Sequence, residues 1–194
     1  MLSRKDVSNE AVIGITICAF LGTVALFFTG LLIAQLAAFN PNIKVGILFL
    51  IVATFGLIFS AIVYANAAGE INTKKVDSEH EFIAIGNSIS EFLGIYPFII
   101  AIPLVINAIT DDPFLRTSTF IITLLSIVAY TFSRFSIVAR ASSQKSTRIL
   151  VGIIMGVFLT LLNFGQNTQG FFETTSVIFL VILTYLAYRF RYNT

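Results

Sequence analysis

The polar residues most able to do chemistry lie in one otherwise apolar stretch, residues 81–107. Its first part contains Asn87, Ser88, Ser90 and Glu91, and the remainder is rich in Ile, Phe and Leu. An ionised carboxylate that faces lipid is costly, so intramembrane carboxylates face a wet cavity, pair with another group or lie at the interface. We therefore expect Glu91 to occupy one of these three positions. The first of them would place an ion pathway beside Glu91.

Two prolines interrupt the same stretch. Pro97 and Pro103 lack a backbone N–H, so each removes one helical hydrogen bond. Transporters often place their sites at discontinuous membrane helices, and the sequence predicts a helix broken at Pro97 and Pro103. Residues 81–93 form either an amphipathic segment in the inner interface or the first turns of a straight membrane helix. Asn107, near the outer end, either lines the pathway or donates a hydrogen bond to another helix.

A polar mouth is predicted where three helices reach the inner membrane surface. Asn66 and Glu70 are four residues apart at the end of the second apolar run, so they share one helix face. Arg134 lies at the end of the fourth run. Together with Asn87 and Glu91, these side chains would open a pathway along the third helix. Alternatively, water and headgroups solvate them, and the long side chain of Arg134 extends to the interface.

Metal and enzyme chemistry have little support. Asp77 and His80 have the i, i+3 spacing of metal-binding helices, but di-iron bundles use Glu-x-x-His motifs on two helices and this chain has 1 His. The charged stretch around His80 is better explained as a solvated turn. The sequence has no nucleophilic Ser in a Gly-rich turn with a transmembrane His, no His-Glu-x-x-His motif, no paired His for haem and no Asp-rich phosphate-transfer motif. We therefore predict no metal, no cofactor and no catalytic residue.

The composition indicates which solvent surrounds the chain. Of 194 residues, 57% are hydrophobic and only 11% are charged, whereas globular domains carry about 25% charged residues. So much apolar surface requires a lipid bilayer as the main partner. The net charge is +2 with no basic tail, so no nucleic-acid partner is expected. The first apolar run, residues 11–38, is longer than the ~7–15 apolar residues of a signal peptide, which indicates a retained membrane span.

The apolar runs predict an all-α protein with one transmembrane domain, residues 1–194. A membrane helix needs about 20 mostly apolar residues, and the breaks between runs carry turn residues such as Asn40-Pro41-Asn42 and Asp111-Asp112-Pro113. The predicted bundle has six transmembrane helices, at about 11–38, 45–68, 82–109, 116–138, 148–164 and 172–189.

The basic residues predict the orientation of these spans. If the N-terminus is cytoplasmic, Lys44 and Arg116 are the two exceptions among 12 Lys and Arg residues, and all others lie in cytoplasmic segments. We therefore expect a multi-pass protein of the cell membrane with both termini inside. The tyrosines, including Tyr64 and Tyr96, fall in the inner halves of their spans, which predicts a belt at the inner headgroup interface.

Small residues at four-residue spacing predict where helices pack. Close backbone approach drives helix association in lipid, because lipid is as apolar as the side chains. The first span carries Gly14, Gly22 and Gly30 along one such row, and the fifth carries Gly152 and Gly156. These packing seams face either neighbouring helices of the same chain or another subunit.

Two function classes follow. One is transport of an ion or small solute by a channel or carrier, which could be homo-oligomeric, along the third helix. The other is a non-catalytic accessory subunit of a larger membrane complex. Glu91 and Asn107 on the proline-containing helix favour transport, whereas the scarcity of charge within the spans favours the accessory role. In either case the expected partners are lipid and further membrane subunits, identical or different.

Overall fold

The structure is a computed structural model that describes residues 4–73, 76–133 and 145–190. Most of these residues are helical, and none of them forms a strand. The helices are α1 (Arg4–Ala34), α2 (Ile43–Thr73), α3 (Val76–Ile89), α4 (Tyr96–Ile109), α5 (Pro113–Ser133), α6 (Lys145–Phe164) and α7 (Gln169–Phe190). A π-helical segment, η2 (Ser90–Ile95), joins α3 to α4, and short 3-10 turns, η1 (Leu36–Ala38) and η4 (Gly165–Asn167), follow α1 and α6.

Within the described residues, five helical segments are long and apolar enough to cross a membrane. They are Ser8–Ala34, Ile43–Gly69, Glu81–Ile109, Pro113–Thr131 and Gly170–Phe190. The fifth predicted span, residues 148–164, is also helical, but its apolar part, Ile149–Phe164, is shorter. The prediction of an all-helical, multi-pass membrane protein is thereby confirmed.

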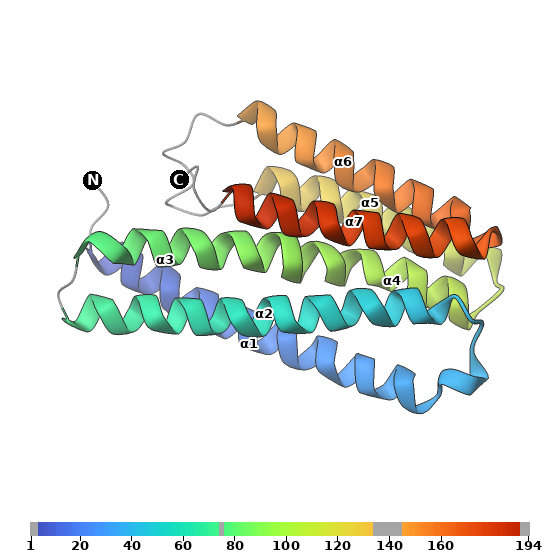
Figure 1. Cartoon of the computed structure of the whole chain (residues 1–194), viewed down its shortest axis with the longest axis horizontal. Coiled ribbons are helices and arrows are strands. Elements are labelled where there is room, and N and C mark those ends of the chain that lie inside the picture. Colours follow the sequence, from blue (N-terminus) through green and yellow to red (C-terminus); the bar gives the residue numbers. More distant parts are fainter. Residues whose placement is uncertain (1–3, 74–75, 134–144, 191–194) are drawn as a thin grey trace.

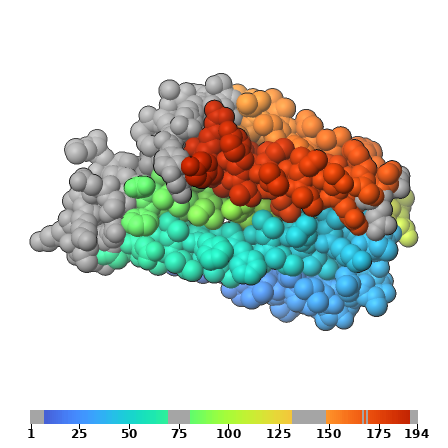
Figure 2. All heavy atoms as spheres, in the orientation of Figure 1, coloured from blue at the N-terminus to red at the C-terminus, as the bar shows by residue number. Residues whose placement is uncertain are grey.

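Helix α2 and the third span, which consists of α3, η2 and α4, form the centre of the bundle. The two lie side by side along their length, with α1 crossing on one side and α5, α6 and α7 on the other (Figure 1). In the most apolar part of each, 56% of the residues are buried, against 22% in α1 and 17% in α5. In Figure 2 little of the third span is visible between α2 and α7.

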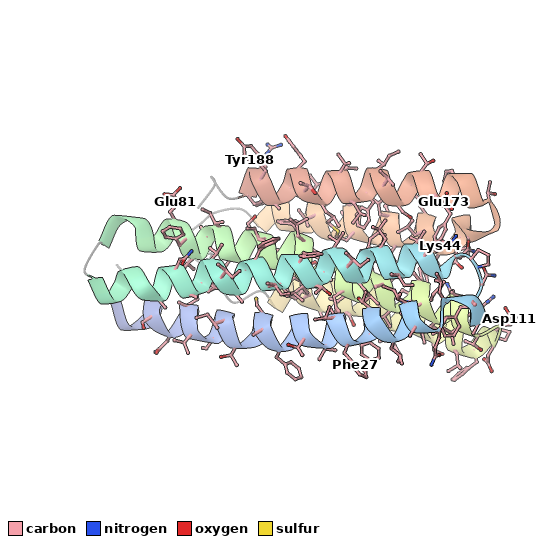
Figure 3. The ribbon with its side chains drawn as sticks, turned by 60° about the horizontal axis from the view of Figure 1, so that its bottom comes forward. Phe27, Lys44, Glu81, Asp111, Glu173 and Tyr188 are labelled. Atoms are coloured by element: carbon pink, nitrogen blue, oxygen red, sulfur yellow. The ribbon has the colours of Figure 1, made fainter. Side chains whose placement is uncertain are left out.

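Large apolar side chains cover the outside of the bundle. Phe20 and Phe27 of α1 are 67% and 66% exposed, and Phe27 points away from the other helices (Figure 3). The charged residues labelled in Figure 3 lie towards the two ends, with Glu81 at one and Lys44, Asp111 and Glu173 at the other. This distribution fits a molecule whose middle is surrounded by lipid.

The predicted turns are present, but the first helix ends early. Asp112 Oδ1 accepts hydrogen bonds from the amides of Phe114 (2.8 Å) and Leu115 (3.0 Å), a helix N-cap with proline at the first position. The first span was predicted to reach residue 38, which is wrong, because α1 ends at Ala34. The chain leaves the helix there and forms η1, and the amide of Asn40 then donates to the Ala108 carbonyl at 3.3 Å.

Candidate functional site

The third span is widened where the sequence predicts a break. Pro97 cannot donate to the carbonyl of Leu93, four residues earlier. The helix instead adopts the wider π form over Ser90–Ile95, and the Tyr96 amide donates to the Glu91 carbonyl, five residues back. Helix α4 then runs through Pro103 to Ile109. The predicted breaks at Pro97 and Pro103 are therefore corrected to one π-helical segment in a continuous helix.

Glycines bring α2 into direct contact with this segment. A Cβ atom on Gly56 of α2 would clash with the carbonyl group of Leu93, and a Cβ on Gly94 would lie 2.8 Å from the Leu57 side chain. The sequence analysis missed both glycines. The signal for Gly94 was its four-residue spacing from Ser90 and Gly86, the same kind of row that marked the first span, whereas Gly56 belongs to no such row of three.

Glu91 lies on a buried side of the π-helical segment. Its side chain is 5% exposed, and it follows Glu81, the start of the apolar span, by ten residues, or about 15 Å of α-helix. Next to it, Ser88 Oγ donates to the Ala187 carbonyl of α7 at 2.7 Å, and the Phe92 and Phe190 rings lie 5.2 Å apart. A side chain solvated by headgroups would be exposed, so Glu91 takes an interior position among the predicted alternatives.

Asn87 belongs to a hydrogen-bonded chain that joins three helices. The Tyr64 hydroxyl of α2 donates to Asn87 Oδ1 at 2.6 Å, and Asn87 Nδ2 donates to Glu10 Oε1 of α1 at 3.1 Å. The sequence analysis did not select Glu10. Its signal was an acidic residue directly before the first apolar run, where its carboxylate can reach a neighbouring helix.

Tyr64 is enclosed by two glycines. A Cβ on Gly14 of α1 would lie 2.8 Å from its ring, and a Cβ on Gly86 of α3 would lie 2.9 Å from it. Tyr64 is 3% exposed and Tyr96 is 0% exposed. The prediction that these two tyrosines lie in a headgroup belt is therefore wrong, because glycine slots and ring packing draw them into the bundle. Tyr96 stacks edge-on against Tyr130 at 5.4 Å.

The predicted polar mouth is assembled only in part. Asn87 and Glu91 both lie in the first half of the third span, but Asn66 is exposed. Asn66 follows the buried Tyr64 by two residues, which turns it about 200° around α2 and away from the network. The side chains of Glu70 and Arg134 lie outside the part of the chain that the structure describes.

Asn107 makes a contact between helices at the end of the third span. It is 7% exposed, and its Nδ2 donates to Asn163 Oδ1 of α6 at 2.7 Å. Arg116 of α5 closes the same end by donating to the Asn107 carbonyl (2.7 Å), the Thr110 carbonyl (2.6 Å) and Asp111 Oδ1 (2.6 Å). Asn107 is thus held by the helix–helix hydrogen bond that one of the two sequence interpretations describes.

The predicted seams face neighbouring helices in four of five positions. Gly14 contacts Tyr64, and a Cβ atom on Gly22 would lie 3.4 Å from the Leu57 side chain. A Cβ atom on Gly30 would have no neighbouring atom within 4 Å. In α6, a Cβ atom on Gly152 would lie 3.1 Å from Thr131, and a Cβ atom on Gly156 would lie 3.8 Å from Leu124. The seam of α1 therefore packs within the chain up to Gly22 and then separates from α2.

The described side chains hold no group of three or more His, Cys, Asp and Glu residues that could bind a metal ion. The side chains of Asp77 and His80 are outside this description. A comparison with family models, curated proteins and solved structures finds no match to this chain. The functional argument therefore rests on the geometry alone.

Proposed function

We propose that the protein is a six-span transporter or channel of the cell membrane, with both termini inside, that moves a small cation or proton past Glu91. One observation carries the proposal: a carboxylate that is 5% exposed lies in a π-helical segment of a membrane span. Ionisable residues inside membrane spans commonly mark ion pathways and proton relays. π-Helical segments are likewise frequent at functional sites.

The surroundings of Glu91 suit a cation that arrives from the inner side. Asn87 precedes Glu91 by one turn and is bonded to Glu10, so acceptor oxygens from α1 and α3 approach the same end of the third span. Hard cations and protons prefer oxygen ligands of this kind. On the opposite wall, Gly56 lets α2 pack closely on the π-helical segment and exclude lipid from it.

Reconstituted liposomes test the proposal. We expect proton or alkali-cation flux in the wild type and an at least tenfold lower flux in Glu91→Gln, the factor that about 1.4 kcal/mol of lost ion binding gives. Glu81→Gln is the matched control, because Glu81 lies on the same helix but is exposed, and its flux should equal that of the wild type. Equal flux in Glu91→Gln, or no ion flux from folded protein, would contradict the proposal.

An accessory subunit is the second candidate, and the outer face of α1 favours it. A groove of about 350 Å³ between α1 and α2 is lined by small and apolar residues, among them Ala19, Gly22, Ala61 and Ala65. Such a groove suits a helix of another subunit, identical or different. Under this alternative the purified chain would be unstable without its partner chains. A stable, symmetric homo-oligomer in a mass measurement would instead favour transport.

A further inference from the structure

Side-chain amides gather at the end of the bundle opposite the Glu10 network. Three contacts hold the start of α2 and the ends of α4 and α6 together there. The backbone N–H of Asn40 donates to the Ala108 carbonyl (3.3 Å). The side-chain Nδ2 of Asn42 donates to the Gln166 carbonyl (3.1 Å), and Asn107 Nδ2 donates to Asn163 Oδ1 (2.7 Å). We call this group the outer amide cluster; its members are Asn40, Asn42, Asn107, Asn163 and Gln166.

Two buried polar atoms of the outer amide cluster have no hydrogen-bond partner among the described residues. They are Asn107 Oδ1, an acceptor on a side chain that is 7% exposed, and Gln166 Nε2, a donor. Asn163, the partner of Asn107, precedes Gln166 by three residues, so both lie on one side of the helix end. Buried polar atoms in proteins nearly always have a partner, because burial removes them from water.

We propose that the outer amide cluster binds a small neutral molecule through a hydroxyl group. The hydroxyl would donate to Asn107 Oδ1 and accept from Gln166 Nε2, since one O–H group can do both. An anion could not donate to Asn107 Oδ1, and a metal cation could not accept from Gln166 Nε2. Arg116 donates a hydrogen bond to the Asn107 carbonyl, so its positive charge disfavours a cation beside this residue. The same chemistry is offered by water and by small polyols.

This site goes beyond the proposed function, because it lies at the other end of the third span from Glu91 and involves a different class of ligand. A high-resolution structure of the full chain in lipid tests it first. We expect ordered density within about 3.2 Å of both Asn107 Oδ1 and Gln166 Nε2. A map that shows waters elsewhere in the bundle, but no density between these two atoms, would overturn the proposal.

Thermal unfolding with ethylene glycol as the probe distinguishes the two sources of the hydroxyl. If a polyol binds, the Tm of the wild type rises by about 3–5 °C at ten times Kd. Gln166→Leu, in the η4 turn after α6, should lose this rise, and Asn66→Leu, an exposed amide outside the cluster, should keep it. If the Tm changes equally in the wild type and in both variants, and density lies between Asn107 Oδ1 and Gln166 Nε2, the bound molecule is water. A rise that survives in Gln166→Leu would contradict polyol binding at this site.

Discussion

The central pair formed by α2 and the third span differs from the peripheral helix α1 in burial but hardly in hydropathy. Mean hydropathy is 2.6 for α2, 2.2 for the third span and 2.4 for α1, yet burial is 56%, 56% and 22%. The central pair is joined by backbone contacts at Gly56 and Gly94, with Gly46 against Val105 in addition. In lipid, the closeness of backbones decides which helices form the core, because apolar character does not separate them.

Gly56→Ala should break the central pair and have the largest effect. The new methyl group would meet the Leu93 backbone, which cannot move like a flexible side chain. We expect the free energy of unfolding to fall by about 3 kcal/mol or more, the upper end of overpacking costs. Thermal unfolding and the yield of monodisperse protein in detergent measure this. Wild-type stability in Gly56→Ala would contradict the contact between α2 and the π-helical segment.

Asn163→Leu tests how firmly an outer helix is attached to the centre. The substitution removes the 2.7 Å hydrogen bond and leaves the buried Asn107 amide without it. We expect a loss of about 1–2 kcal/mol in the free energy of unfolding. In the double variant Asn107→Leu and Asn163→Leu, neither amide is buried without its partner, so part of the loss should be recovered. If the two single losses simply add, the pair does not link α4 to α6.

Tyr64→Phe measures the polar contribution inside the glycine slot. The ring stays between Gly14 and Gly86, and only the 2.6 Å hydrogen bond to Asn87 is lost. Interhelical hydrogen bonds in membranes contribute about 0.6 kcal/mol on average, and the thermal unfolding temperature should fall accordingly. Tyr185→Phe is the control, because Tyr185 is 56% exposed. An equal change in both variants would show that the contact with Asn87 adds nothing.

Gly30→Ala should have the smallest effect. Nothing lies within 4 Å of the position that its Cβ would take, and alanine favours a helix over glycine by about 0.5–1 kcal/mol. We expect unchanged or slightly raised thermal stability of the monomer. If Gly30→Ala instead dissociates a homo-oligomer in a mass measurement, a helix of a second copy covers this part of α1, and the expectation of a small effect is wrong.

The sequence was sufficient to predict where the helices lie along the chain, but not which helices contact one another. Apolar run lengths and turn residues such as Asp112 predict where most helices begin and end, because these are local properties. The bond from Asn163 to Asn107 depends on which helices meet, and a lone Asn in an apolar run carries no information about its partner. Pro97 predicts a lost hydrogen bond, but whether the helix bends, breaks or widens depends on what packs against it. Here that is Gly56, which no pattern in the third span could reveal.

The π-helical segment also sets the angular phase of the third span. Its wider turn holds about one residue more than an α-helical turn, so everything after Ile95 is rotated by about 100° from where an unbroken α-helix would place it. A helical wheel drawn through residues 81–109 therefore assigns Asn107 to the wrong side. Deleting one residue between Ser90 and Ile95 would keep the length and apolar character of the span. It would also leave both Asn87 and Asn107 facing their present partners, because the segment could then close into an ordinary α-helix. Straightening the segment at its full length would instead turn Asn107 away from Asn163, so that one additional residue sets the register between the two ends of the helix.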